Sequence, residues 1–248
     1  MMCINNNSTD AYFNLAAEEY LLNSFPEDVF MLWQNEPSVV IGKHQNVWAE
    51  INPGFVLERD IKVVRRFSGG GAVYHDMGNL NLTFIERNQY PDFDKFTSVL
   101  LNLLAKIGIQ AKADERRGLT LNGFKISGSA QCIHKHKSMF HATLLFNTDL
   151  NILTQALQGD AEQANDWSGE SRVTYVNSVK SQVTNIQKYL VSPMQLQEFK
   201  EIVMDYFLED KMVNKAYVFS EKDIEAIGRL KKEKYATNEW NFKASLLK

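Results

Sequence analysis

The chain has 248 residues, and its 44% hydrophobic and 23% charged content, with 15 Phe, 9 Tyr and 4 Trp, is typical of a folded globular protein. A formal net charge of −3 and the lack of a long basic block argue against a nucleic-acid partner. There is no leader pattern and no apolar run of about 18 residues, and the two cysteines, Cys3 and Cys132, suit a reducing compartment. We therefore expect a cytoplasmic protein without a membrane span.

The first third of the chain is predicted to hold one amphipathic helix and a series of short strands. Thr9 or Asp10 is a suitable N-cap for a helix over residues 10–25. Helical spacing puts one set of its residues on a common face: Phe13, Ala16, Ala17, Tyr20, Leu21 and Ser24. The elements expected next are strands 29–35 and 38–46, a short helix 53–60, strand 61–67, and strands 71–75 and 79–86 paired across the turn Asp76 to Asn79.

The rest of the chain alternates between helical and strand patterns. Residues 93–107 have helical spacing of apolar positions, and Gly108 stands where a C-terminal glycine belongs. Two further helices are expected to begin after Ser192-Pro193 and at Ser220, and strands are expected at 109–113, 118–123, 124–133 and 138–147. Clustered strands favour a mixed α+β fold with mainly antiparallel sheets flanked by helices. Without a Gly/Ser/Pro-rich linker, we expect one domain over residues 1–248.

Two segments contain the candidate functional residues. In RRFSGGGAVYH, residues 65–75, three glycines follow Arg65 and Arg66, which point to opposite faces of a strand, so one of them is a candidate anion clamp. The glycines fit neither the dinucleotide-binding fingerprint nor the phosphate-binding loop with its lysine. In NGFKISGSAQ, residues 122–131, Asn122-Gly123 predicts a hairpin turn and Lys125 follows on the returning strand beside small residues.

These motifs, taken together and in order, resemble the lipoate-protein ligase A family. The similarity begins at AYFNLAAEEYLL and continues through RRFSGGGAVYHDMGNLNLTFI, NGFKISGSAQ, HATLLFN, SVKSQVTN and EWNF, so it spans nearly the whole chain. The resemblance implies the α+β catalytic domain shared with biotin protein ligases. It also implies activation of lipoate by ATP and Mg²⁺ to lipoyl-AMP, and transfer to a lysine of a carrier: the lipoyl domains of 2-oxoacid dehydrogenase E2 subunits or the glycine-cleavage H protein.

The same resemblance assigns roles to residues of this chain. Arg66 is implied to contact the nucleotide, main-chain groups of Gly71, Ala72, Val73 and Tyr74 to bind it, and Lys125 to bind both the nucleotide and the lipoyl carbonyl. Ser68 and His75 are expected to line the acyl pocket or to position the backbone. Fixed cations and backbone N–H groups suit adenylation, because a carboxylate must approach an anionic phosphate. No resident metal ligands are assigned.

The chain departs from the family pattern at a few places. Arg117-Gly118 replaces the family's Asn-Asp, Ala142 replaces a glycine, and Gln182 replaces an arginine. The sequence stops shortly after EWNF, so we expect no C-terminal accessory domain, and activation could require a separate accessory-domain protein. A lipoate-binding module that has lost the activation chemistry is therefore one alternative.

A second alternative is an ATP-independent octanoyl or lipoyl transferase that uses Cys132 as its nucleophile. Relatives of that kind carry a cysteine nucleophile, whereas a lone cysteine is commonly a small buried hydrophobic residue. Finally, HKHK at residues 134–137 predicts a basic hairpin tip rather than a metal site, and such a tip could meet an acidic carrier surface.

Overall fold

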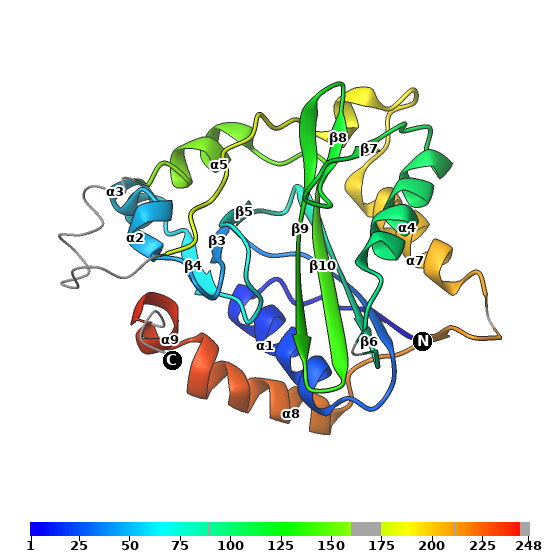
Figure 1. The fold of residues 1–248 in the computed structure, drawn as a ribbon, viewed down its shortest axis with the longest axis horizontal. Helices are drawn as coiled ribbons and strands as arrows, with labels where there is room; N and C mark the ends of the chain where they lie inside the picture. Colours follow the sequence, from blue (N-terminus) through cyan, green and yellow to red (C-terminus); the bar gives the residue numbers. More distant parts are fainter. Residues whose placement is uncertain (89, 160–174, 211, 244–248) are drawn as a thin grey trace.

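An eight-stranded and a three-stranded sheet form the framework of the protein in the computed structural model, which describes residues 1–88, 90–159, 175–210 and 212–243 (Figure 1). The large sheet has the order β11-β1-β2-β6-β10-β9-β8-β7, and the small sheet β4-β3-β5. The strands are β1 Met2–Asn5, β2 Val29–Trp33, β3 Ser38–Ile41, β4 Lys62–Arg65, β5 Val73–His75, β6 Asn79–Glu86, β7 Lys112–Ala113, β8 Leu119–Leu121, β9 Phe124–His134, β10 Lys137–Leu145 and β11 Lys215–Ala216.

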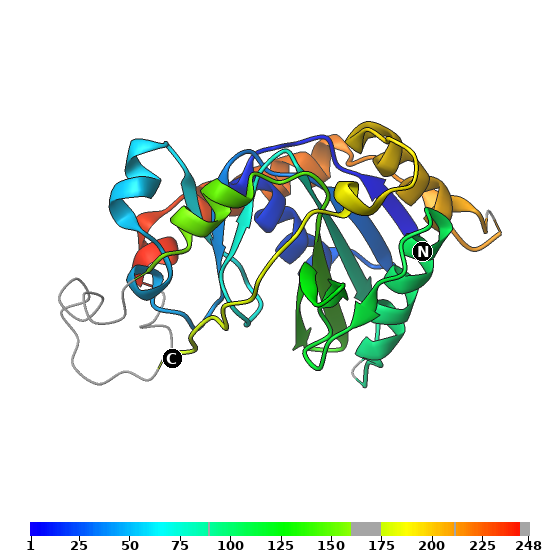
Figure 2. The same ribbon diagram turned by 90° about the horizontal axis from the view of Figure 1, so that it is seen from above.

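Helices cover both sheets. Apart from a 3₁₀ turn at Ile186–Tyr189 and a π-helical turn at Lys231–Tyr235, they are α1 Ala11–Ser24, α2 Val47–Glu50, α3 Pro53–Glu58, α4 Phe93–Lys106, α5 Leu150–Ala156, α7 Leu196–Leu208, α8 Glu221–Leu230 and α9 Asn238–Lys243. Helices α2 and α3 lie at the opposite end of the molecule from α4 and α7 (Figure 2). Within the described ranges, none is both long and apolar enough to cross a bilayer. The expected α+β class with mainly antiparallel pairing is confirmed.

Alternation along the strands separates three apolar cores. On β6, Phe84 packs in the core that contains α4 and α7, whereas its neighbour Ile85 packs in the core that contains α1. On β3, Val40 faces α1 and Val39 faces the core with α2, α3 and α5. Helix α1 therefore fills the space between the two sheets, and its surroundings differ from those of a surface helix.

The burial of α1 corrects one expectation. Asp10 caps the helix as predicted, but the buried positions include Glu18 and Glu19, whereas Ser24 on the predicted face is exposed. Contact with both sheets explains this, because a helix between two layers buries most of its circumference. Each glutamate has donors: Thr83 Oγ1 lies 2.6 Å from Glu18 Oε1, and Lys234 Nζ lies 2.6 Å from Glu19 Oε2.

The expected pairing of strands 71–75 and 79–86 is wrong. β5 pairs with β3 in the small sheet, whereas β6 pairs with β2 and β10 in the large sheet. The intervening turn passes the chain from one sheet to the other, and the Asp76 carboxylate fixes it by accepting from the backbone N–H of Gly78 and of Asp149. β6 is buried along almost its whole length, and two neighbouring strands satisfy its backbone groups better than one hairpin partner would.

Other expectations are confirmed, and several elements were missed. The Asn122-Gly123 turn joins β8 to β9 with positive φ at both residues, and Gly108 ends α4 with φ of +79°. The basic tip lies between β9 and β10, but Lys137 turns back and donates to the carbonyl oxygens of Leu21 and Phe25 at the end of α1. Helices α5 and α9 and the π-helical turn were not predicted, since they are short and lack strong periodicity.

Asp223 fastens α8 to α1 and generates a prediction about stability. Its carboxylate accepts from Tyr20 Oη at 2.5 Å, Tyr217 Oη at 2.6 Å and Ser220 Oγ at 2.7 Å. Burial by itself raises the pKa of Asp223, but these hydrogen bonds outweigh it and lower the pKa to about 2. Because the folded-state pKa lies below the ordinary value, this stabilisation is present above about pH 4 and is lost as the pH falls towards 2.

We expect Asp223→Asn to lower the free energy of unfolding by about 1–3 kcal/mol near neutral pH. The free energy of unfolding of the wild-type protein should fall between about pH 4 and 2 as Asp223 is protonated, and this part of the fall should be missing in the variant. Denaturant unfolding over a pH series measures both effects. Glu225→Gln, at an exposed position of the same helix, is the matched control. Equal pH dependence of the wild-type and Asp223→Asn proteins would contradict the assignment.

Candidate functional site

The glycine loop, residues 69–71, folds around the side chain of Arg66. Arg66 is 4% exposed, and its Nη2 donates to the carbonyl oxygens of Gly69 at 2.6 Å and Gly71 at 2.7 Å. Nε donates to Ser68 Oγ at 3.1 Å. Burial lowers the pKa of Arg66 to about 10, while the charge of Glu18 opposes that shift. Arg66 therefore stays charged at neutral pH and forms a fixed cation against the inner side of the loop.

Arg65 serves a different part of the molecule. It is completely buried, and it donates to main-chain carbonyl oxygens on two segments: Gly42 and Gln45 after β3, and Trp240 and Asn241 in α9. Its own backbone is held in turn, since Trp240 Nε1 donates to the Arg65 carbonyl at 2.7 Å. The two arginines thus act on opposite sides of β4, and Arg66 is the one that meets the glycine loop.

Two glycines of this loop are required by close approaches. Gly70 has φ of +87°, and a Cβ there would lie 2.9 Å from Arg66 Nη2 and 3.3 Å from the Ala130 side chain on β9. A Cβ on Gly71 would lie 2.9 Å from Ser178 Oγ. At Gly69 no atom comes within 4 Å of a built Cβ, so this glycine is not needed for packing.

A crossing segment, residues 175–184, lies against the glycine loop and the start of β9. Ser178 Oγ accepts from the backbone N–H of Ala72 at 2.7 Å, and Ser178 N donates to Glu50 Oε1 at 3.0 Å. Further along, Lys125 N donates to the carbonyl of Gln182 and Thr184 N donates to the carbonyl of Lys125. Gln182 therefore contributes its main chain, and its side chain is exposed. The segment joins the two motifs that the sequence singled out.

A β-bulge brings Lys125 to the face of the sheet that meets the glycine loop. Leu119 pairs with Ser127 but Thr120 pairs with Lys125, so Ile126 is an extra residue in β9. Simple alternation would have put Lys125 on the same face as Ser127. With the bulge, a Cβ on Gly128 would lie 3.9 Å from both Lys125 Cε and Val73 Cγ1, so the lysine extends over an open floor beside the segment 71–74.

A buried polar network lies behind the loop, between α1 and the large sheet. His141 on β10 joins Ser68 and Glu18, with Nε2 2.8 Å from Ser68 Oγ and Nδ1 2.8 Å from Glu18 Oε1. Thr83 Oγ1 donates to the same glutamate oxygen, and Trp33 Nε1 donates to Thr83 at 2.9 Å. Ser68 is completely buried, so it positions Arg66 and His141 from inside the protein.

His75 belongs to a second buried cluster on the same sheet face. Its Nδ1 lies 3.1 Å from Asn35 Nδ2, and its Nε2 lies 3.2 Å from Thr143 Oγ1. Burial and the nearby charge of Arg66 lower the pKa of His75 to about 3, so the ring is neutral at physiological pH. The sequence reading missed Glu18, Thr83 and Thr143. Their signal is polar residues at positions that alternation places inside, which becomes visible only once the register is known.

The departures from the family pattern lie in different surroundings. Ala142 packs in the apolar core on the α4 side of the large sheet, away from the glycine loop. Arg117 has φ of +61° and forms an ion pair with Asp94, with Nε 2.6 Å from Oδ1. Gly118 lies beside Lys125: a Cβ there would be 3.1 Å from Lys125 Cε and 2.6 Å from Asp114 Oδ2.

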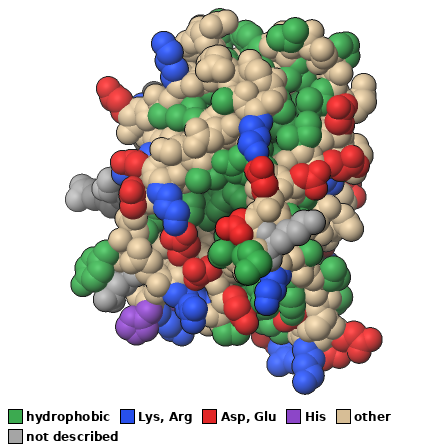
Figure 3. All heavy atoms as spheres, turned by 90° about the vertical axis from the view of Figure 1, so that its right-hand side faces the viewer, with side chains coloured by type: hydrophobic (Ala, Val, Ile, Leu, Met, Phe, Trp, Pro, Cys, Tyr) green, Lys and Arg blue, Asp and Glu red, His purple; other side chains and the backbone are tan. Residues whose placement is uncertain are grey.

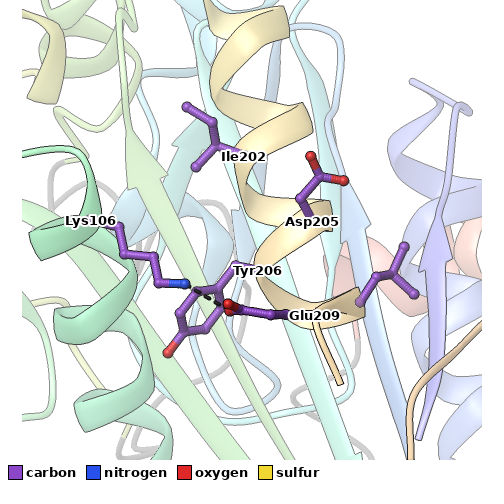
Figure 4. Close-up of a pocket in the computed structure, with 6 residues that line it drawn as sticks. Lys106, Ile202, Asp205, Tyr206 and Glu209 are labelled. Carbon is purple, nitrogen blue, oxygen red and sulfur yellow. Dashed lines mark hydrogen bonds and ion pairs between the residues drawn. The ribbon is translucent and has the colours of Figure 1, made fainter. Parts of the chain in front are cut away.

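One pocket lies elsewhere, on the side of the molecule that Figure 3 shows, where apolar side chains gather between charged ones. It measures about 440 Å³ and is lined by the last residue of α4 and by residues at the C-terminal end of α7 (Figure 4): Lys106, Ile202, Asp205, Tyr206, Leu208 and Glu209. Because α4 and α7 cover the opposite sheet face from α1, this pocket is separate from the glycine loop. Among the described residues, no group of three or more His, Cys, Asp or Glu side chains could hold a metal ion.

Comparison with known proteins identifies the family of this chain. The family described as Lipoyl protein ligase A/B catalytic domain matches residues 10–208. Lipoate–protein ligase 1 of Staphylococcus aureus is 37% identical over 243 residues, which cover 96% of this chain and 72% of that protein. The chain belongs to the lipoyl protein ligase A/B family, as its motifs predicted.

Solved structures show the same fold. A bipartite lipoate protein ligase from Thermoplasma acidophilum, studied with its E2 lipoyl domain, has a TM-score of 0.80 at 24% identity, with 100% of this chain and 97% of that chain covered. A lipoate-protein ligase A bound with ATP has a TM-score of 0.80 at 22% identity, with 99% of this chain and 98% of that chain covered. The α+β architecture is therefore that of lipoate-protein ligases.

The glycine loop yields a prediction with a control inside the same three residues. Gly70→Ala must adopt positive φ and push against Arg66, which costs about 1–3 kcal/mol and displaces the loop. Gly69→Ala meets open space and should be tolerated. Thermal unfolding and calorimetric titration with a non-hydrolysable ATP analogue measure both variants. Equal stability and equal nucleotide affinity of the two variants would contradict this account of the loop.

Proposed function

We propose that this chain activates lipoate with ATP and transfers the lipoyl group to a lysine of a lipoyl-carrier domain. The observation that carries the proposal is the convergence of Lys125 and residues 71–74 on one sheet face, with the buried charge of Arg66 behind the loop. Two cations and a glycine-rich backbone in one place suit a reaction between two anions. The chain belongs to the lipoyl protein ligase A/B family and is 37% identical to a lipoate–protein ligase, which supports the proposed substrate and reaction type.

In the first step, an oxygen of the lipoate carboxylate attacks the α-phosphorus of ATP, and the bond to the pyrophosphate oxygen breaks. We assign Lys125 to electrostatic stabilisation: its ammonium reaches the phosphoryl oxygens and the lipoyl carbonyl from the open floor at Gly128. In the second step, the amine of the carrier lysine attacks the carbonyl carbon of the mixed anhydride and AMP leaves. The anhydride is already reactive, so the protein need only position the incoming amine.

The nucleotide segment contributes less free backbone than the sequence suggested. Val73 and Tyr74 belong to β5 and pair with β3, and the Ala72 amide meets Ser178. We therefore propose that nucleotide binding displaces the Ser178 hydroxyl from Ala72, while Arg66 acts mainly through its charge and through the loop that it shapes. Direct contact of Arg66 with the nucleotide stays a prediction.

We place the acyl group of lipoate beside the polar network of Ser68 and His141, on the face of the sheet that carries Trp33. His75 lies deeper, between Asn35 and Thr143, and its neutral ring is suited to position the strand rather than to exchange a proton. This assignment keeps Ser68 and His75 in supporting roles at the acyl side of the site.

The remaining parts of the reaction are proposed from chemistry. Mg²⁺ commonly binds through substrate phosphates and one or two carboxylates, so we propose that it arrives with ATP rather than in a site built by the protein. The carriers proposed are E2 lipoyl domains, one of which accompanies the Thermoplasma ligase, and the glycine-cleavage H protein. Whether a separate accessory protein is needed is decided by the assay below. The free thiols Cys3 and Cys132 support a cytoplasmic location.

The test is mass spectrometry of a purified lipoyl domain after incubation with this protein, lipoate, ATP and Mg²⁺. We expect a lipoyl mass increase that requires ATP, and release of pyrophosphate. Lys125→Ala should lower the rate of lipoyl-AMP formation by about 100-fold or more while the Tm stays unchanged. Lys180→Ala, an exposed position of the crossing segment, is the control. Wild-type turnover by Lys125→Ala would falsify the role of Lys125, and nucleotide-independent transfer would overturn the ligase assignment.

The structure also bears on the alternative that uses Cys132 as a nucleophile. Burial, together with the nearby charge of Glu18, raises the pKa of the Cys132 thiol to about 12, so little thiolate exists at neutral pH. We expect Cys132→Ser to retain its transfer rate within about twofold, because the substitution removes no nucleophile. The rate of lipoyl-domain modification measures this. A variant that cannot transfer yet folds normally would restore the thiol mechanism.

A further inference from the structure

We propose that Asp114 is a positioning residue for Lys125, an inference that rests on the ligase reaction proposed above. Asp114 follows β7, and its Oδ2 lies 3.8 Å from Lys125 Nζ. Both side chains are partly sheltered, with 29% and 23% of their surfaces exposed. The carboxylate therefore faces the ammonium and keeps the lysine extended over its open floor.

The two oxygens of Asp114 have separate tasks. Oδ1 accepts from the backbone N–H of Arg116 at 2.8 Å and of Gly118 at 2.7 Å, which closes the turn between β7 and β8. Oδ2 is the atom directed at Lys125. A carboxylate whose first oxygen is fixed by two backbone donors has few orientations left, so its second oxygen is held in place without loss of further side-chain freedom.

Gly118 makes this arrangement possible. A Cβ at that position would lie 2.6 Å from Asp114 Oδ2, 2.8 Å from the Ser127 carbonyl oxygen and 3.1 Å from Lys125 Cε. Any side chain would therefore enter the space that the carboxylate and the lysine stem occupy. Ser129 Oγ donates to the Arg117 carbonyl at 3.0 Å and fastens the same turn to β9. The turn, the glycine and the lysine form one unit, and Asp114 is the charged group in it that faces Lys125.

The carboxylate acts on the reaction through Lys125. It holds the ammonium in reach of the phosphoryl oxygens, and it repels the polyphosphate of ATP. Removal of its charge should therefore lower kcat for adenylation without raising the KM for ATP. If Asp114 only closed the turn, Asp114→Asn would leave kcat unchanged, because the amide keeps an oxygen for the two backbone donors.

The experiment compares Asp114→Asn, Asp114→Glu and Asp94→Asn. Asp94→Asn is the matched control, since Asp94 pairs with Arg117 of the same turn and not with Lys125. The first readout is the rate at which an amine-reactive reagent labels Lys125 in the protein alone, followed by mass spectrometry. The second is kcat and KM for ATP in pyrophosphate release. Thermal unfolding checks that each variant is folded.

We expect Asp114→Asn to label at Lys125 about two- to fivefold faster and to lose a similar factor in kcat, with KM for ATP unchanged or lower, the size expected of a partly exposed ion pair. Asp114→Glu should restore kcat within about twofold, and Asp94→Asn should match the wild type. Unchanged labelling, or faster labelling with unchanged kcat, overturns the proposal. A wild-type protein without ATP-dependent activity refutes the ligase function instead, while the labelling still decides whether Asp114 holds Lys125.

Discussion

The burial of two adjacent guanidinium groups at the end of β4 is the constraint on which the candidate site depends. A buried cation without partners is strongly destabilising, so the chain around Arg65 and Arg66 must turn oxygen atoms towards them. Arg65 draws together the loop after β3 and α9, and Arg66 draws in the carbonyls of Gly69 and Gly71. The shape of the glycine loop is thus set by hydrogen bonding to a fixed charge and not by the flexibility of glycine alone.

Helix α1 extends the same principle to the polar network of His141 and to α9. Its consecutive glutamates point in different directions: Glu18 meets His141 and Thr83, whereas Glu19 meets Lys234 and Tyr235. Lys234 also lies 3.9 Å from the centre of the Trp240 ring, whose indole holds the Arg65 carbonyl. Charged side chains buried between α1 and the sheets therefore connect the glycine loop, the polar network and α9 through continuous contacts.

Much of the fold could be predicted, because local signals were strong. Asp10 at a helix start, Asn122-Gly123 at a hairpin and Gly108 at a helix end act through their own backbone preferences, and each element appears where expected. The predicted pairing of β5 with β6 was wrong. Proximity along the chain favours a hairpin, but β5 pairs with β3, and β6 pairs with β2 and β10. The predicted buried face of α1 was wrong because helical periodicity assumes that a helix packs against one layer only, whereas α1 packs between two sheets.

For the site, the sequence by itself identified the candidate residues: the arginine pair, the glycine run, and the lysine after a hairpin. These are properties of residue type and local order, and the family likeness follows from them. Only the tertiary structure decided how they meet. The extra residue Ile126 turns Lys125 to the other face of β9, Ser178 reaches the Ala72 amide from more than a hundred positions away, and Asp114 comes to face Lys125. Register, bulges and long-range contacts depend on the packing of distant segments, and no local pattern encodes that packing.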